Sequence, residues 1–384
     1  MKKAFKNNKY YSQEGILEKV EKNYLFGKIV IFLFDLVFLA IRKIIFSKSK
    51  AGNLIIISFH RLGDTVFTIP AVKEIFKEFP TYKKIILCYP ESKYIYNQVF
   101  DEDIHVLDKN NFKLGSRIAN TYSRRILKKL NPGIIVDLTG TAASASLIFS
   151  SRASIITGMN ERIFKGIYTN YTNRRKTPHL IDTYLDVAEL VSKFEKTKEL
   201  YQFKTEINLK GKILIHPFSV HLAKEWNLQK FVSLAEKLSD DYSVEIISPE
   251  NKLTDDDKEN IIQKGIPLSI TKSMEELISK IKESSVFISN DTGPLYIANL
   301  LGKATFTIYG PTNPEFSLPF GNYHAYIQKK IECSPEPGHQ YCYTLAGVYC
   351  PVYECMNQLS VSEVYNSVKS FFSRIGIKKT EPVS

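Results

Sequence analysis

Short apolar runs alternate with stretches of helical spacing in the first half of the chain. The apolar runs predict strands at Leu54–Phe59, Lys84–Tyr89, Ile104–Leu107 and Gly133–Leu138. Apolar residues three and four positions apart predict helices at Thr68–Phe79, with Pro70 in its first turn, and at Ser116–Leu130. This alternation is typical of βαβ units and predicts a parallel sheet.

The alternation starts again after residue 205, beyond a charged, helix-compatible region at Asp182–Phe203. Strands are predicted at Lys212–His216, Val244–Ile247, Val286–Ile288 and Thr305–Tyr309. Helices are predicted at Leu228–Leu238, Thr254–Gln263, Met274–Glu283, Leu295–Leu301 and Val361–Phe372. A chain of 384 residues is long enough for two cores. We therefore predict two Rossmann-like α/β/α domains, residues 51–205 and 206–384, that face each other across a cleft.

Residues 24–46 form the most apolar window of the sequence. Lys28, Asp35 and Arg42 interrupt it seven residues apart, a spacing that places them on one narrow stripe of a helix. A carboxylate in the middle disfavours a membrane-spanning helix. An interfacial helix with basic flanks on anionic headgroups fits better, and a helix packed on the protein's own surface is the alternative. Residues 1–50 are thus predicted to be a basic tail and a membrane-associated helix.

The net charge of +12 favours an anionic partner such as a nucleotide, a phosphorylated glycolipid or a membrane surface. The basic residues are scattered and accompany no nucleic-acid-binding motif, so we expect no nucleic acid partner.

The cysteines divide into one residue in an apolar run and a group near the C-terminus. Cys88 is expected in the core. Cys333, Cys342, Cys350 and Cys355 lack the C-x-x-C spacing of zinc sites, so we predict a surface loop without a bound metal. Disulfides between them remain an alternative in an oxidising compartment.

Two glycine-containing turns follow predicted strands in the second block. Asp291-Thr292-Gly293 comes after the first strand, and Gly310-Pro311-Thr312 comes after the next. In open α/β sheets ligands bind beyond the carboxyl ends of strands, where helix N-termini attract anions. This arrangement predicts a phosphate-bearing ligand.

Asp64 lies in the turn after the first strand, Arg61-Leu62-Gly63-Asp64-Thr65. Gly63 permits a close approach to a ligand, and a carboxylate at a strand end can act as a general base toward an incoming hydroxyl. An N-cap for the following helix is the structural alternative for Asp64.

Lys224 stands between a strand and a helix in Lys224-Glu225-Trp226, after His216-Pro217-Phe218-Ser219. Its ammonium could neutralise a departing diphosphate, although a solvated surface lysine is the commoner case. Glu250 is placed at a strand end where it could accept hydrogen bonds from a ribose. Asp255–Asp257 is interpreted as a helix start, and not as a metal site.

Together these motifs resemble the heptosyltransferases of glycosyltransferase family 9. The resemblance rests on R-L-G-D-T with T-I-P-A, H-P-F-S with K-E-W-N-L, S-N-D-T-G-P-L-Y-I-A-N-L-L-G and I-Y-G-P-T-N-P, in that order. A C-terminal cysteine-containing segment that ends in C-M-N-Q-L-S is similar too. The resemblance implies a GT-B fold and an inverting, metal-independent transfer of a sugar from a nucleotide donor, ADP-heptose by analogy. The acceptor would be a lipid-linked saccharide at the cytoplasmic face of the inner membrane.

The resemblance also implies roles for individual residues. It assigns Asp64 as base and Lys224 as the contact to donor phosphate, with Arg61 and Gly63 on the acceptor side. The implied donor-binding residues are Ser219, Glu250, Asp291, Thr292, Gly293, Tyr296, Gly310 and Thr312. Amides at the helix N-terminus would stabilise the diphosphate, so a metal cofactor would be dispensable.

Tyr296 departs from the family pattern, which has histidine three residues after the glycine of D-T-G. Pro294 in the turn and Ser248, where many members have glycine, are further departures. A phenol donates a hydrogen bond but is not readily charged at neutral pH. A related transferase with another nucleotide sugar, or a non-catalytic glycolipid- or nucleotide-binding protein, are therefore the alternatives to heptosyl transfer.

Overall fold

The computed structural model describes Leu36 and residues 52–114, 118–149, 151–159, 165–175, 177–342, 350 and 352–379. The predicted membrane helix at 24–46 lies outside these residues, apart from Leu36. The chain divides into two compact units. The first comprises Met1–His60, Phe67–Arg175 and Ile181–Glu195, and the second comprises Arg61–Val66, Lys176–Leu180 and Lys196–Ser384. Across the described residues, no helix combines the length and the apolar composition needed to cross a bilayer.

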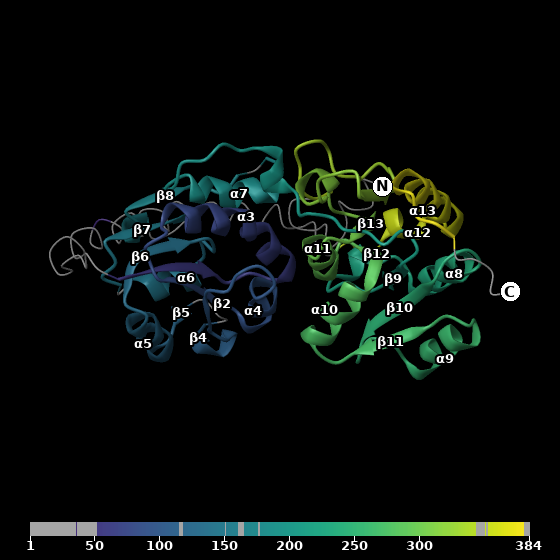
Figure 1. Ribbon diagram of the computed structural model, residues 1–384, viewed down its shortest axis with the longest axis horizontal. Helices are drawn as coiled ribbons and strands as arrows, with labels where there is room; N and C mark the ends of the chain where they lie inside the picture. The colour runs from purple at the N-terminus through teal and green to yellow at the C-terminus, as the bar shows by residue number, and fades with distance from the viewer. Residues whose placement is uncertain are drawn as a thin grey trace, which may run out of the picture. The chain divides into compact units, whose positions relative to one another are not determined.

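The first unit is built on a parallel sheet with the order β3-β2-β1-β6-β7-β8 (Figure 1). Its strands are β1 (Asn53–Ser58), β2 (Lys84–Cys88), β3 (Asp103–Val106), β6 (Pro132–Asp137), β7 (Ile155–Met159) and β8 (Asn170–Thr172). Its helices are α3 (Leu62–Glu78, shared with the second unit), α4 (Pro90–Tyr96), α5 (Thr121–Lys129), α6 (Ala142–Ile148) and α7 (Leu180–Ala188). A small antiparallel pair, β4 (Phe112–Lys113) and β5 (Ile118–Ala119), precedes α5.

The second unit repeats the plan with the order β11-β10-β9-β12-β13-β14, again parallel throughout. Its strands are β9 (Lys212–His216), β10 (Val244–Pro249), β11 (Leu268–Thr271), β12 (Ser284–Asn290), β13 (Ala304–Tyr309) and β14 (His324–Gln328). Its helices are α8 (Leu228–Ser239), α9 (Asp255–Gln263), α10 (Met274–Glu283), α11 (Gly293–Leu300), α12 (Glu354–Asn357) and α13 (Val361–Ile375). The predicted α/β class with two parallel sheets is confirmed.

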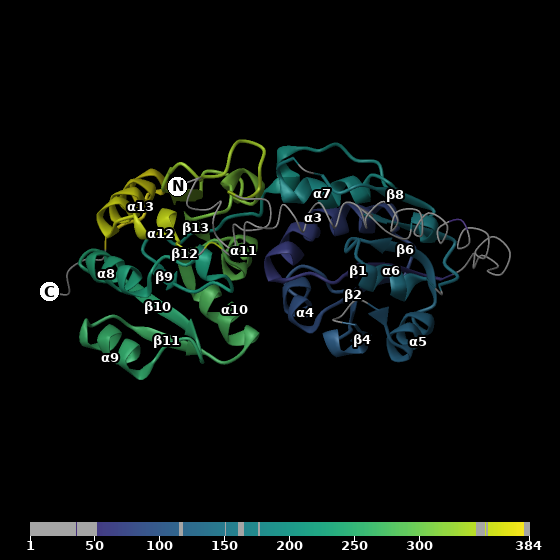
Figure 2. The same cartoon turned by 180° about the vertical axis from the view of Figure 1, so that it is seen from behind.

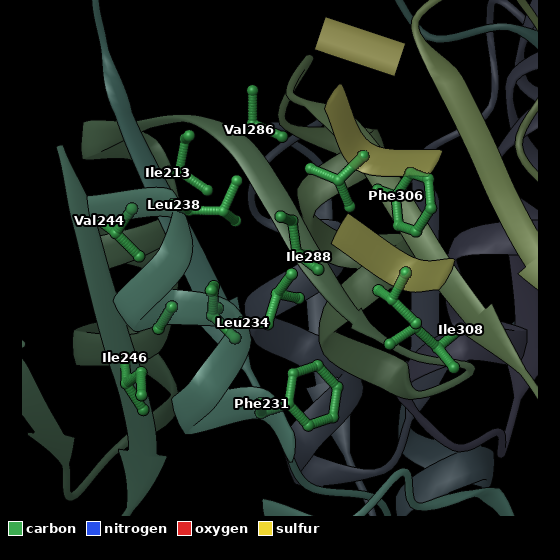
Figure 3. Packing of buried hydrophobic residues seen from close by; sticks show 14 of the residues in the cluster. Ile213, Phe231, Leu234, Leu238, Val244, Ile246, Val286, Ile288, Phe306 and Ile308 are labelled. Carbon is green, nitrogen blue, oxygen red and sulfur yellow. The ribbon is translucent and has the colours of Figure 1, made fainter. Parts of the chain in front are cut away.

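The core of the second unit lies between its sheet and the neighbouring helices α8 and α13, which Figures 1 and 2 show side by side. Phe231, Leu234 and Leu238 project from α8 toward Ile213 and Ile288 of the sheet (Figure 3). All five are fully buried. At about 25 cal/mol per Å² of apolar surface, such burial supplies most of the force that holds the helix on the sheet.

Helix α3 begins earlier than predicted, at Leu62 instead of Thr68. The amide of Thr65 donates to the carbonyl of Arg61 (2.9 Å), which closes the first helical turn directly after β1. Pro70 therefore lies inside the helix, and its placement in the first turn was wrong. Because proline lacks an N–H, it removes one backbone hydrogen bond from the helix interior.

Other boundaries also differ from the prediction. Helix α5 begins at Thr121, later than Ser116, because Asn120 caps it by accepting a hydrogen bond from the amide of Ser123 (2.9 Å). The predicted helical region Asp182–Phe203 is helical only to Ala188, apart from a short 3₁₀ turn at Lys198–Tyr201. In contrast, α9 starts at the aspartates as expected, with a capping box formed by Thr254 and Asp257.

Candidate functional site

The site lies at the carboxyl ends of β9 and β12, which are neighbours in the middle of the second sheet. The chain continues from β9 to one side of the sheet and from β12 to the other, so the strand order reverses between them. Such a switch point is where open α/β sheets bind their ligands. The segment after β9 carries Ser219 and Lys224, and the segment after β12 carries Asp291 and Thr292.

Lys224 and Asp291 form a buried ion pair at this edge. The Nζ of Lys224 donates to the Oδ2 of Asp291 at 2.6 Å, and the two side chains are 15% and 5% exposed. Burial alone would lower the pKa of Lys224, but the Asp291 carboxylate outweighs it and the pKa is raised. Burial alone would likewise raise the pKa of Asp291, yet the Lys224 ammonium holds it below its ordinary value. Both groups are therefore charged at neutral pH, and Lys224 is not a solvated surface residue.

The other oxygen of Asp291 is bound by Tyr296, the residue that departs from the family pattern. The hydroxyl of Tyr296 donates to Oδ1 at 2.6 Å, and the side chain is 5% exposed. Thr312 is also buried near Asp291, but among the described residues its Oγ1 has no partner with hydrogen-bond geometry.

Asn290 is a structural residue of the site that the sequence did not reveal. Its Oδ1 accepts from the amide of Trp226 (3.0 Å) and its Nδ2 donates to the carbonyl of Pro217 (2.8 Å). These bonds tie the segment that carries Lys224 to the end of β12. An asparagine directly before D-T-G was the available signal, but its partners are distant in the sequence.

Asp64 lies in the first turn of α3, in the segment Arg61–Val66 that groups with the second unit. It is a helical residue, so the N-cap alternative was wrong, although the helix dipole still favours a carboxylate there. Its charge contributes to the raised pKa of Lys224. Among the residues that the structure describes, no side chain donates to the Asp64 carboxylate. It is half-buried and could accept a proton from a hydroxyl.

The same segment makes close contacts with the region around β12. A Cβ added at Gly63 would lie 2.9 Å from Cδ2 of Tyr296, and one added at Gly293 would lie 3.0 Å from Cβ of Leu62. Nη1 of Arg61 lies 3.4 Å from Nε2 of His221. Burial, Lys224 and Arg61 lower the pKa of His221, so its imidazole is neutral at neutral pH. Arg61, Gly63, Asp64, Lys224 and Asp291 are thus brought together.

The remaining predicted residues are placed less centrally. The amide of Ser219 donates to Oε1 of Glu225 (2.6 Å), so this contact holds the loop. Gly310 follows β13, and a Cβ there would lie 3.2 Å from the carbonyl of Ala223, beside Lys224. Glu250 follows β10 as predicted but is exposed, with Lys272 as a distant partner at 3.8 Å. It is not part of the cluster around Asp291.

Comparisons with known proteins agree with this architecture. The sequence profile of glycosyltransferase family 9 (heptosyltransferase) matches residues 123–344, more than half of the chain. The chain belongs to this family. Lipooligosaccharide heptosyltransferase 2 of Campylobacter jejuni is 25% identical over 328 residues, which cover 80% of this chain and 95% of that protein.

Solved structures show the same fold as this glycosyltransferase. A family 9 glycosyltransferase of Veillonella parvula superposes with a TM-score of 0.69 at 17% identity, covering 85% of this chain and 99% of that one. The ADP-heptose LPS heptosyltransferase II of E. coli superposes with a TM-score of 0.64 at 14% identity, covering 84% of this chain and 99% of that one. The two sheets are therefore those of the GT-B fold.

Helix α11 of this glycosyltransferase begins directly after β12, at the switch point. Thr292 is its N-cap residue but does not use its hydroxyl to cap the helix, and Gly293 is the first helical residue. The partly exposed Thr292 hydroxyl and the first amides of α11 can therefore bind an anion.

The C-terminal cysteines line one small pocket, which Ala223 and Gly310, beside Lys224, also border. Cys333, Cys342, Cys350 and Cys355 border a space that is partly open to solvent. No disulfide joins them in the described chain, and no group of side chains there has the geometry of a metal site. Cys88, in contrast, is fully buried, and burial raises the pKa of its thiol to about 12, so its predicted core position is confirmed.

Proposed function

We propose that this glycosyltransferase moves a heptose, with inversion, from ADP-heptose to a lipid-linked saccharide in the assembly of lipopolysaccharide or a related cell-surface glycan. Family membership supports the sugar, since the family is described as heptosyltransferases. The names of two relatives, an ADP-heptose LPS heptosyltransferase and a lipooligosaccharide heptosyltransferase, support the donor and the acceptor class. The reaction would take place at the inner face of the cytoplasmic membrane.

One observation carries the proposal: the charged Lys224–Asp291 pair sits at the switch point with the Asp64 carboxylate close enough to influence it. A sugar transferase needs a base for the acceptor and positive charge for the leaving diphosphate. Asp64 supplies the first. Lys224 and the amides at the start of α11 supply the second.

The chemistry then requires three coupled changes. Asp64 takes the proton of the acceptor hydroxyl, and the freed oxygen attacks the anomeric carbon of the heptose from the face opposite the diphosphate. The bond from that carbon to the diphosphate oxygen breaks, and the electron pair leaves with ADP. Lys224, the Thr312 hydroxyl and the α11 amides stabilise the new negative charge. These protein donors would carry the transfer without a metal ion, so EDTA should leave the rate unchanged.

Replacement of the base tests this proposal. Asp64→Ala should lower kcat by about 10²–10⁴-fold, as expected for loss of general-base catalysis, while the Kd for ADP changes little. Release of ADP from ADP-heptose, with heptose-deficient lipopolysaccharide as acceptor, measures kcat, and calorimetry measures ADP binding. Glu78→Gln is a matched control, because it removes an exposed carboxylate from the same helix and should have the wild-type rate. Transfer by Asp64→Ala at the wild-type rate would show that Asp64 is not the base.

The donor is tested separately with the wild-type protein. Only a true donor nucleotide stabilises the fold by mass action, so ADP-heptose should raise Tm more than UDP- or GDP-sugars do. A larger shift with another nucleotide sugar would replace heptose in the proposal. Absence of a shift with every nucleotide would instead favour a non-catalytic glycolipid-binding protein.

A further inference from the structure

Tyr296 contacts the segment that carries Asp64 and the carboxylate that binds Lys224. Its hydroxyl donates to Oδ1 of Asp291 at 2.6 Å. Its ring covers Gly63 so closely that a Cβ at that position would lie 2.9 Å from Cδ2 and 3.3 Å from Cε2. Gly63 precedes Asp64 in the chain, and Asp291 binds Lys224. One side chain thus adjoins the neighbours of both the base and the cation.

The hydroxyl of Tyr296 is already committed inside the protein. Tyr296 is 5% exposed, and the fully buried Tyr309 and the buried Ser317 lie near it, with 3.3 Å between the Tyr309 hydroxyl and Oγ of Ser317. Burial and the Asp291 carboxylate raise the pKa of Tyr296, so the phenol remains a donor. A donor aimed at a buried carboxylate is unsuited to meet a phosphate at the same time.

The two oxygens of Asp291 have different partners, and this division fixes the ion pair. Oδ1 accepts from Tyr296 and Oδ2 accepts from Lys224, both at 2.6 Å. With Oδ1 bound, the carboxylate cannot rotate without losing a charge-assisted hydrogen bond. The ammonium of Lys224 therefore has one preferred position, beside Oδ2 of Asp291.

We propose that Tyr296 is a positioning residue, which aligns Lys224 through Asp291 and seats the turn of Asp64 against its ring, and that it does not bind the donor phosphate. This inference rests on the proposed function, because alignment matters only if Asp64 and Lys224 act in one reaction. In this proposal Tyr296, which departs from the family pattern, holds Lys224 and the turn of Asp64 in place. Misplacement of reacting groups by a fraction of an ångström is enough to slow a transfer.

Kinetics of Tyr296→Phe separate positioning from phosphate binding. Loss of a hydrogen bond to a buried charge corresponds to a fall in kcat on the order of 10- to 100-fold, while KM for the donor and Kd for ADP should stay within about threefold. Tyr242→Phe is the matched control: it removes a buried tyrosine hydroxyl that binds Lys369 (2.9 Å), remote from the site, and should keep the wild-type kcat. A tenfold weaker Kd for ADP with unchanged kcat would identify Tyr296 as a phosphate ligand, and an unchanged enzyme would also overturn the proposal.

The contact between the Tyr296 ring and Gly63 is tested by one substitution at Gly63 and a second at Tyr296 that should relieve its effect. Gly63→Ala places a methyl group against the Tyr296 ring. It should lower kcat about tenfold without weakening the binding of ADP. Tyr296→Leu provides room for that methyl group, so Gly63→Ala should cost nothing further in a Tyr296→Leu background. An equal loss in both backgrounds would show that the ring does not seat the turn.

A third measurement does not depend on transfer activity. In a double-mutant cycle on thermal unfolding, Tyr296→Phe and Asp291→Ala should be non-additive, whereas Tyr242→Phe and Asp291→Ala should add. If the wild-type protein transferred no sugar, the proposed function would fail while this cycle still decided the contact. Additive shifts for Tyr296 and Asp291 would remove the positioning role.

Discussion

Lys224 and Asp291 are charged inside the protein because each has the other as a partner. Taking two charges out of water costs several kcal/mol per ion, and their attraction repays this only with good geometry. The pair is therefore poor evidence for added stability. Its retention at a strand switch point, in place of two apolar residues, is better explained by the chemistry of a phosphate-bearing substrate.

Removal of one partner should cost more stability than removal of both. Lys224→Met leaves a buried carboxylate without its cation and should lower the free energy of unfolding by about 3–5 kcal/mol. Lys224→Met combined with Asp291→Asn should regain part of that loss, because no uncompensated charge remains. Trp226, the only tryptophan and fully buried, reports unfolding of the second unit by its fluorescence in urea.

The matched control for this pair is an exposed one. Lys272 and Glu250 are 67% and 52% exposed, so Lys272→Met should change the free energy of unfolding by less than about 1 kcal/mol. If Lys224→Met were as mild, or the double variant less stable than the single, the pair would not be the buried, mutually dependent contact described.

At the scale of elements, two histidines make the second sheet sensitive to acid. His216 ends β9 and His324 begins β14, and burial lowers the pKa of each from 6.5 to about 4. Both are neutral in the folded protein. Because the unfolded chain binds protons below its pKa of about 6.5 and the fold does not, stability is complete above that pH and falls as the pH drops toward 4.

Between pH 7 and pH 5 each histidine should remove about 2 kcal/mol from the free energy of unfolding. His324→Gln should reduce the pH dependence by that amount, measured by urea unfolding with Trp226 fluorescence at both pH values. His339→Gln is the control, since it replaces an exposed histidine. An unchanged slope in His324→Gln would mean that His324 is not the acid-sensitive group.

How far the elements could be predicted depends on their apolar content. Central strands such as β9 and helices such as α10 have clear patterns, and their predicted bounds are those observed. The edge strands β8 and β14 were missed because they are short and only partly buried, so polar residues interrupt the pattern. The start of α3 was missed because Pro70 was placed in its first turn, whereas the helix begins at Leu62, eight residues before Pro70.

The candidate site was predictable in its residues but not in its contacts. Asp64, Lys224 and Asp291 stand at strand ends, and the carboxyl ends of parallel strands lie on one edge of a sheet. Local sequence gave no means to decide whether Lys224 was buried, because its partner is 67 residues away. The contact between Gly63 and Tyr296 was equally hidden, since it depends on how the segment Arg61–Val66 packs on the region after β12.

At the scale of the whole molecule, the acceptor that we propose would link the reaction to a membrane. The chain has a net charge of +12, and its most apolar window, residues 24–46, is followed by Lys48 and Lys50. An apolar face in the acyl boundary and basic residues at anionic headgroups reinforce each other, at about 1 kcal/mol per basic residue near the surface. A transferase that acts on a lipid-linked saccharide would gain from such an anchor, because it would concentrate the enzyme where its acceptor is.

Vesicle sedimentation tests this anchor. The full-length protein should sediment with vesicles that contain phosphatidylglycerol and less with pure phosphatidylcholine, and a variant lacking Leu25–Phe46 should stay in the supernatant. ADP should still raise the Tm of that variant, and this result would show that its second unit is folded. The double variant Lys48→Glu, Lys50→Glu separates the electrostatic contribution to membrane binding from the apolar one. It should weaken binding to anionic vesicles by about tenfold or more while leaving the apolar segment intact. Equal sedimentation of the deletion variant would place the membrane contact elsewhere on the basic surface, and the apolar segment would then belong to the protein's own packing.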